Sequence, residues 1–305
     1  MERLTRQPRN CPFCGQREAS RRFAAGNVRP DAWTDFAFAS RKLPEYMHWP
    51  LQECRTCRVV YADPAPSPGE LAALYGEAAF DSGVEARWAS RTYGRHLRRF
   101  VKRLPDRASA VDIGTGDGAF LRELLAAGFQ SVTGIEPSAA PIAAADPSIR
   151  ERIIHDVFKP GLFPDGSLSL VTCFQTIEHV SDPLALCRDA GRALRPGGAL
   201  FLVAHNRRAL SALALGSKSP IYDIEHLQLF SPASLRNLLV AAGFDRATIS
   251  VRPIFNAYPL HYWARLFPFP GALKTRLVRL LARTWPGRWP VVLPAGNLAA
   301  VAFKS

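Results

Sequence analysis

The middle of the chain alternates short apolar runs with a glycine-rich turn and a helical stretch. Residues 110–113 read as a short buried strand, and leucines at helical spacing follow over residues 119–128. A second apolar run, residues 132–135, predicts another strand, and Glu136 follows it directly. The order strand, glycine-rich turn, helix, strand and acid is typical of a βαβ unit that binds a nucleoside.

The turn between the first strand and the helix carries three alternate glycines, Gly114, Gly116 and Gly118. Glycines let a ligand approach the backbone, and Glu136 can accept hydrogen bonds from both hydroxyls of a ribose. Gly114, Gly116 and Ala119 also satisfy the looser G-x-G-x-x-A pattern of dinucleotide sites. The glycines alone therefore do not select the nucleoside.

Two further acids favour a cationic nucleoside. Asp112 ends the first strand, and Asp117 lies inside the turn. Carboxylates at these positions repel a pyrophosphate but attract the sulfonium and amino groups of S-adenosylmethionine. S-adenosylmethionine is therefore the expected cofactor.

At this point the chain resembles the class I S-adenosylmethionine-dependent methyltransferases. The resemblance covers roughly residues 108 to 251, and its pieces are residues 111–118, 134–138, 155–157, 163–171, 177–183, 194–198 and 226–231. It implies an α/β, Rossmann-like fold in which a seven-stranded sheet carries helices on both faces. The motifs are specific for this superfamily and poorly specific for the substrate.

The resemblance also implies where the cofactor lies. Glu136 is expected to hold the ribose, Asp156 to accept from the adenine amine beside the backbone of Val157, and Gln175 to meet the methionine end. The complete expected cofactor-binding set is Asp112, Gly114, Gly116, Asp117, Gly118, Glu136, Asp156, Val157 and Gln175.

The expected general base lies after the fourth strand. His179 follows that strand at the carboxyl edge of the sheet, where ligands sit in open α/β folds, and imidazole titrates near neutral pH. The alternative is a histidine that caps the next helix. By family resemblance, His226 and Tyr222 face the cleft from the acceptor side and are further catalytic candidates.

Residues 175–179 are similar to the E-x-x-E-H metal motif of some quinone and small-RNA O-methyltransferases. The first glutamate of that motif is Gln175 here, which is a neutral and weaker ligand. No catalytic metal is therefore predicted.

Four cysteines form two C-x-x-C pairs, Cys11 with Cys14 and Cys54 with Cys57. Two such knuckles can complete a tetrahedral zinc site of four thiolates, which is closed and therefore structural. A disulfide pair or a redox motif fits less well, because neither pair lies in a thioredoxin-like βαβ unit. The two remaining cysteines, Cys173 and Cys187, are expected to be small buried hydrophobes.

The chain divides into four expected parts. They are a zinc-ribbon module at 1–65, a helical basic linker or lid at 66–107, the methyltransferase core at 108–251, and a C-terminal insert with the last core strand at 252–305. Ser67, Pro68 and Glu70 predict a capped helix start. The first two parts resemble a methyltransferase subgroup with an N-terminal zinc ribbon, whose members often act in sugar, cell-surface polysaccharide and natural-product pathways.

The net charge of +13 comes from two segments. Residues 87–107 hold eight Lys or Arg and one acid, while residues 246–305 hold nine and no acid. Such segments face an anionic partner or a membrane surface, although a solvated face beside the active-site cleft is the plainer explanation for the first.

The C-terminal excess falls in an insert at 252–297, between expected last strands at 247–251 and 298–303. Its helix sets an apolar stripe against a basic face; the stripe is Leu273, Leu277, Leu280, Leu281 and Trp285, and the face is Lys274, Arg276, Arg279 and Arg283. Peripheral contact of residues 271–289 with an anionic bilayer and packing as a lid on the core are both open.

The N-terminal residues are too polar for a signal peptide, and no apolar run approaches the roughly 20 residues of a spanning helix. The expected compartment is the cytoplasm, with peripheral contact at the inner membrane face as an extension. The favoured function is methyl transfer to a small-molecule or lipid-linked acceptor. An RNA methyltransferase that uses the zinc ribbon and the basic helix is one alternative, and a non-catalytic scaffold is another.

Overall fold

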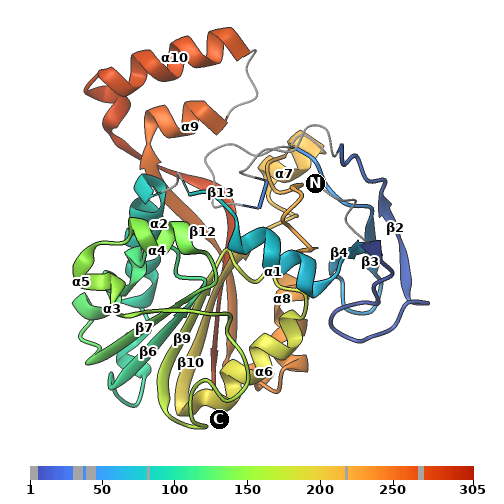
Figure 1. Cartoon of the computed structure of the whole chain (residues 1–305), viewed down its shortest axis with the longest axis vertical. Helices are drawn as coiled ribbons and strands as arrows, with labels where there is room; N and C mark the ends of the chain where they lie inside the picture. The colour runs from blue at the N-terminus through green and yellow to red at the C-terminus, as the bar shows by residue number, and fades with distance from the viewer. Residues whose placement is uncertain (1–5, 30–36, 39–45, 81–82, 217–218, 267–270) are drawn as a thin grey trace.

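The computed structural model describes residues 6–29, 37–38, 46–80, 83–216, 219–266 and 271–305 (Figure 1). The described residues form three sheets: a seven-stranded sheet in the core, a four-stranded sheet in the N-terminal part, and a two-stranded sheet of β1 (Arg6–Gln7) and β5 (Ala65–Pro66). Figure 1 shows helices on both faces of the large sheet and a helical lobe, α9 and α10, that projects beyond one end of it.

The seven-stranded sheet has the order β12-β13-β10-β9-β6-β7-β8. Strands β8, β7, β6, β9 and β10 run parallel, and β13 is antiparallel to both of its neighbours. This confirms the expected Rossmann-like fold. The strands are β6 (Ser109–Ile113), β7 (Ser131–Glu136), β8 (Ile153–His155), β9 (Leu168–Phe174), β10 (Leu194–His205), β12 (Ile249–Pro259) and β13 (Pro290–Phe303).

Alternate residues of the central strands are buried on opposite faces of the sheet, as the two-residue period of a strand requires. In β10, Phe201 packs edge-on to Phe100 below α2, with ring centroids 5.2 Å apart. Its neighbours Leu200 and Leu202 belong to the opposite cluster, under α6 and α8. The covering helices are α2 (Gly83–Leu97) and α3 (Ala119–Ala126) on one face and α6 (Pro183–Ala193) and α8 (Pro232–Ala241) on the other.

The N-terminal module, which carries the four cysteines, shares a sheet with the core. Its strands β2 (Ser20–Ala24), β3 (Leu51–Cys54) and β4 (Val60–Ala62) are completed by β11 (Gln228–Leu229), which comes from the core. The indole nitrogen of Trp49 donates to the carbonyl of Ile224 over 2.7 Å. The segment that carries Glu225 and His226 is therefore held by the N-terminal module.

Helix α1 (Pro68–Gly76) begins as the sequence predicts. The Ser67 hydroxyl accepts from the backbone of Glu70, and the Glu70 carboxylate accepts from the backbone of Ser67 over 2.9 Å, which completes a capping box. Cys173 and Cys187 are fully buried, as expected.

The C-terminal insert is shorter than the sequence predicts. Strands β12 and β13 stay paired from Ile249 opposite Ala302 to Pro259 opposite Pro290, with one bulge. The excursion consists of α9 (Leu260–Leu266), α10 (Gly271–Arg283) and a 3-10 turn at Pro286–Arg288. Residues 254–258 and 291–293 are rich in β-branched and aromatic side chains, which favour a strand.

Among the described residues, no helix is both long enough and apolar enough to cross a membrane. Of the predicted apolar stripe on α10, the side chain of Leu273 lies outside the described residues. Leu277 and Leu281 are half-buried, whereas Leu280 and Trp285 are exposed.

Candidate active site

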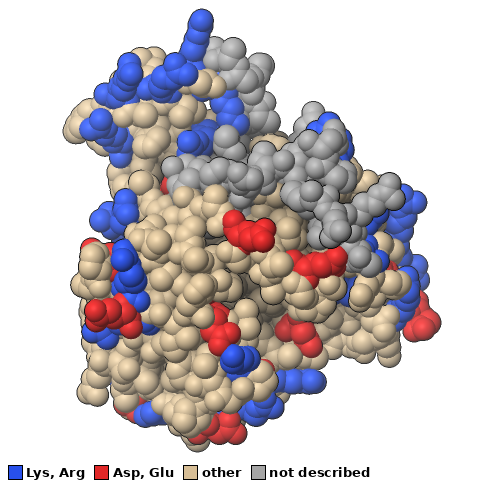
Figure 2. Space-filling model, viewed as in Figure 1, with Lys and Arg blue, Asp and Glu red and all other residues tan. Residues whose placement is uncertain are grey.

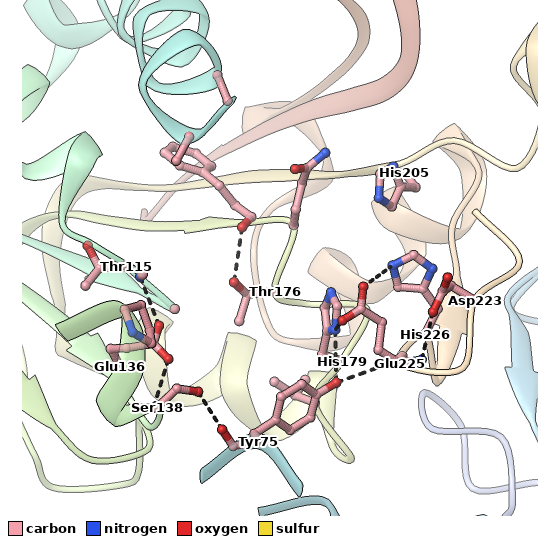
Figure 3. Close-up of a pocket in the computed structure, with 18 of the residues that line it drawn as sticks. Tyr75, Thr115, Glu136, Ser138, Thr176, His179, His205, Asp223, Glu225 and His226 are labelled. Carbon is pink, nitrogen blue, oxygen red and sulfur yellow. Dashed lines mark hydrogen bonds and ion pairs between the residues drawn. The ribbon is translucent and has the colours of Figure 1, made fainter. Parts of the chain in front are cut away.

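A cavity of about 1210 Å³ opens at the carboxyl ends of β6, β7 and β9 (Figure 3). Its lining is mostly apolar, and it is larger than the roughly 300–1,000 Å³ that one drug-sized ligand needs. The carboxyl ends of the strands are where α/β folds bind ligands. The cavity therefore has room for a nucleoside cofactor and a second substrate.

The glycine turn forms one wall. Gly114, Gly116 and Gly118 have φ values of +69°, +58° and +72°, a region that L side chains rarely adopt. A Cβ on Gly114 would lie 2.2 Å from Thr176 Oγ1, and one on Gly118 would lie 2.4 Å from Ile149 Cγ2. A Cβ on Gly116 would meet nothing within 4 Å. Gly116 thus offers open backbone to a ligand, whereas Gly118 serves the packing of the turn and does not line the cavity.

Asp112 braces this turn from below. Its carboxylate accepts from Thr115 Oγ1 over 2.9 Å and from Thr172 Oγ1 over 2.6 Å. Burial raises the pKa of Asp112 to about 7, and the two threonine hydrogen bonds oppose that rise. Asp117 also lines the cavity, and burial raises its pKa.

Glu136 connects the two loops that border the cofactor half. Its carboxylate accepts from the backbone nitrogens of Gly116 and Ser138, each over 2.9 Å. Burial raises the pKa of Glu136, while these backbone hydrogen bonds lower it. Each carboxylate oxygen keeps a second lone pair for a ribose hydroxyl.

The remaining expected cofactor residues divide between the cavity and the surface. Gln175 lines the cavity and holds a left-handed backbone, with φ +50°, directly after β9. Val157 also lines it. The carboxylate of Asp156 does not; it accepts from Lys159 Nζ over 2.5 Å and from Val157 N over 2.8 Å at the surface.

The opposite wall brings together residues that are far apart in the sequence. The hydroxyl of Tyr75, on α1, lies 3.0 Å from Nδ1 of His179. A carboxylate oxygen of Glu225 lies 3.6 Å from the same nitrogen. Figure 3 shows the other edge of the His179 ring turned toward the interior of the cavity. The helix after it, α6, is capped by Asp182, so the described contacts of His179 are those of a cavity residue.

His226 and His205 continue this wall. The ring of His226 lies 5.0 Å, between centroids, from both His179 and His205. Nδ1 of His226 is 2.8 Å from the carbonyl of Ile221, and Nδ1 of His205 is 2.9 Å from the side-chain oxygen of Asn297. Burial lowers the pKa of His205 to about 3, so this ring is neutral.

Two residues of the sequence analysis lie elsewhere. Tyr222 does not line the cavity, and its ring stacks on Phe23 and contacts His48 in the N-terminal module. Glu178 is fully buried, with one carboxylate oxygen 2.6 Å from the backbone nitrogen of His205, and burial raises its pKa to about 7. Gln175 and His179 line the cavity without Glu178, so the residues of the E-x-x-E-H pattern do not converge.

Some contacts of the site carry no local sequence signal. Tyr75 lies 104 residues from the histidine that it contacts, so no local spacing predicts this contact. Glu225 directly precedes the matching segment 226–231, and only His226 of this pair is predicted from the sequence. The far wall is aromatic and comes from β12 and α9, through Tyr258, Tyr262 and Trp263.

Ligand atoms of His179, Glu225 and His226 lie within 4.8 Å of one another, a spacing that a divalent cation can use. The same three side chains can also pass a proton, because imidazole and carboxylate both titrate. Both interpretations involve His179.

The four cysteines of the two knuckles lie within the same 4.8 Å limit of one another. Cys14 Sγ and Cys54 Sγ are 3.8 Å apart, and none of the four is in a disulfide. Sulfurs that surround zinc at about 2.3 Å in a tetrahedron lie about 3.8 Å apart. In each knuckle the residue after the second cysteine, Gly15 or Arg58, has a positive φ that turns the chain. The geometry therefore fits a zinc ion.

A family of proteins described as "Methyltransferase domain" matches residues 86–248. The chain belongs to this family. With the fold and the strand order above, the protein is a class I S-adenosylmethionine-dependent methyltransferase. The predicted family, fold and enzyme class are therefore confirmed.

Curated relatives of this methyltransferase include ubiquinone biosynthesis O-methyltransferases. The one from Psychrobacter arcticus is 27% identical over 168 residues, which are 50% of this chain and 65% of the relative. The one from Pseudomonas aeruginosa is 36% identical over 104 residues, which are 32% of this chain and 44% of the relative. The chain thus spans less than two thirds of the length of these relatives.

Among solved structures, a methyltransferase from Thermotoga maritima, described as a possible histamine N-methyltransferase, superposes with a TM-score of 0.50. The sequences are 18% identical, and the alignment covers 73% of this chain and 93% of that one. At this identity the likeness is one of fold.

Proposed function

We propose that the methyltransferase transfers the methyl group of S-adenosylmethionine to a hydroxyl of a small-molecule or lipid-linked acceptor, and that His179 accepts the hydroxyl proton. The observation that carries this proposal is the contact of Tyr75 and Glu225 with Nδ1 of His179, across the cavity from the glycine turn. Relatives that are named O-methyltransferases support oxygen as the methylated atom.

S-adenosylmethionine, when bound, supplies the methyl group as an electrophile. Gly116 and Glu136 would hold its nucleoside, and the apolar walls would exclude water. The acceptor oxygen would take the methyl group as the sulfur–methyl bond breaks, and its hydroxyl proton would pass to Nε2 of His179. Glu225, 3.6 Å from Nδ1, stabilises the imidazolium that forms.

Ser138 connects the two halves of the cavity. Its backbone nitrogen donates to Glu136, and its hydroxyl donates to the carbonyl of Tyr75 over 2.7 Å. Because Tyr75 also contacts His179, this chain of contacts fixes the distance between the cofactor side and the base. Alignment of the reacting atoms is the larger part of such catalysis.

The cavity favours a small or apolar acceptor over RNA. Among its described lining residues, Lys159 is the one Lys or Arg, whereas an RNA groove needs several cations along the backbone. The sequence also predicts a role in a sugar, cell-surface polysaccharide or natural-product pathway, and this stays a prediction. The curated relatives are named for ubiquinone biosynthesis instead. We also place the protein in the cytoplasm, with residues 271–289 at the inner membrane face.

We further propose that Cys11, Cys14, Cys54 and Cys57 hold one structural zinc ion. Elemental analysis of protein purified without chelator should give one zinc per chain. A zinc content near zero would show that the four cysteines do not hold zinc.

The general-base role is tested by His179→Ala. A positioned base contributes about 100- to 10,000-fold, so turnover should fall by that factor while the affinity for S-adenosylmethionine stays within about twofold. His261→Ala, on α9 and outside the cavity lining, is the matched control and should keep wild-type turnover. Turnover that survives in His179→Ala would rule out this base. Turnover that a chelator abolishes while the zinc content stays at one per chain would assign the His179, Glu225 and His226 cluster to a cation.

A further inference from the structure

Exposed apolar side chains occur on two helical elements near the carboxyl ends of the core strands. On the α9–α10 lobe, Leu280 is 63% and Trp285 is 72% exposed. On the short helix α7 (Leu210–Leu215), Leu210 is 84% and Leu213 is 62% exposed. Figure 1 shows α7 and the lobe beyond the same end of the large sheet. Large apolar side chains exposed in this way mark a binding surface.

Helix α7 also lines the cavity, and on the lobe side α9 and β13 line it rather than the described residues of α10. Ala214 and Leu215 of α7 line it, and so do Leu293 of β13 and Trp263 of α9. Leu293 lines the cavity and is 37% exposed.

Positive charge surrounds the apolar side chains of the lobe. Arg276, Arg279 and Arg283 of α10 are exposed, as is Arg288 of the following turn, and residues 246–305 contain no acid. Figure 2 shows Lys and Arg gathered over the lobe, whereas Asp and Glu lie on the body of the molecule. Cations beside exposed tryptophans suit the headgroup region of an anionic bilayer.

We propose that α7 and the α9–α10 lobe dock on an anionic bilayer, and that an acceptor with a long hydrocarbon chain enters the cavity from the bilayer between them. The inference rests on the proposed function, because the acceptor that enters the cavity is the one that is then methylated. It makes the acceptor an amphiphile, with its nucleophilic head at His179 and its chain along the aromatic wall of Tyr262 and Trp263.

Docking is measured by flotation with vesicles of phosphatidylglycerol and phosphatidylcholine, without any methyl transfer. The wild type should float with the anionic vesicles at low salt and less at high salt. Arg276→Glu with Arg279→Glu should lower the partition coefficient at least about tenfold, and so should Leu210→Glu with Leu213→Glu. Val240→Glu, an exposed apolar position on α8, is the matched control and should float like the wild type.

Unchanged affinity for S-adenosylmethionine shows that the cofactor-binding core of each variant is folded, and an unchanged circular dichroism spectrum shows that its helices are kept. A wild type that stays with the soluble fraction at low salt would make α10 a lid and overturn docking. Flotation of the α7 variant at the wild-type level would remove α7 from the surface. Because flotation needs no acceptor chemistry, either result leaves the methyl-transfer proposal standing.

Entry of a hydrocarbon chain is measured with a series of 4-alkylphenols as probes. Their affinity should rise about tenfold for every two methylene groups until the cavity is filled. Ala214→Trp, which narrows the cavity at α7, should abolish this dependence and leave the affinity for S-adenosylmethionine unchanged. Affinity that does not change with chain length would overturn the amphiphilic acceptor.

Discussion

The two walls of the cavity are built in different ways. The cofactor wall comes from one stretch of chain between Asp112 and Gln175, where each strand ends beside the next. The acceptor wall comes from α1, the segment around Glu225 and His226, and α9. That segment is in turn held by the N-terminal module, through β11 on β4 and through Trp49 on Ile224. The difference predicts that the proposed zinc site supports acceptor chemistry rather than cofactor binding.

The largest expected effect follows from breaking the zinc site. Cys54→Ser should unfold the N-terminal sheet and release the segment with Glu225 and His226, so that turnover falls about 100-fold or more. Calorimetry should find the affinity for S-adenosylmethionine within a few-fold of the wild type. Cys187→Ala, a buried cysteine outside the cluster, should keep both zinc and turnover.

The cofactor wall should show the opposite pattern. Glu136→Ala removes a buried carboxylate that accepts from Gly116 and Ser138. A charge-assisted hydrogen bond contributes about 1.5–3 kcal/mol, so the affinity for S-adenosylmethionine should fall by more than tenfold in calorimetry. Zinc content should be unchanged. Wild-type affinity for S-adenosylmethionine in this variant would show that Glu136 does not bind the ribose.

A milder change tests the same support without unfolding the module. Trp49→Phe keeps the buried ring but removes the donor to the Ile224 carbonyl. The loss of one such hydrogen bond costs about 0.5–1.5 kcal/mol, so turnover should fall by roughly twofold to tenfold. Steady-state kinetics should show a change in the acceptor KM or kcat and none in the KM for S-adenosylmethionine. An equal effect on both substrates would mean that the walls are not independent.

The smallest functional effect is expected at Glu178, which faces neither wall. Burial raises its pKa from 4.5 to about 7, so its contribution to stability is fully present below pH 4.5 and is lost as the pH rises through 7. Glu178→Gln can still accept from the backbone of His205 and carries no charge. It should flatten the stability profile between pH 5 and 8, in urea unfolding, and leave turnover near the wild-type value. If the free energy of unfolding of Glu178→Gln depends on pH as steeply as that of the wild type, another titrating group causes the dependence.

The cofactor wall was predictable because its signals are local. Gly114, Gly116 and Glu136 are spaced by the geometry of one βαβ unit, and the structure brings them to one cavity. The family resemblance also predicts that Asp156 contacts the cofactor, but its neighbour Lys159 holds the carboxylate at the surface. The position of a surface loop depends on contacts that a motif does not encode.

The acceptor wall was predictable only in part. His179 was found because it follows the fourth strand, whereas Tyr75 contacts it across 104 residues of sequence. Tyr222 was expected to face the cleft, but its ring packs against Phe23 of the N-terminal module instead. The docking of that module on the core is a tertiary event, and no spacing in the sequence reports it.

Hydrogen exchange on zinc-stripped protein tests the separation of the two walls most directly. Amides of residues 221–229 should exchange much faster after zinc is removed, because β11 loses its partner strand β4. Amides of residues 112–118 should keep the protection of the zinc-loaded protein, and S-adenosylmethionine should still slow their exchange. Equal loss of protection in both segments, or no change in residues 221–229, would contradict the account.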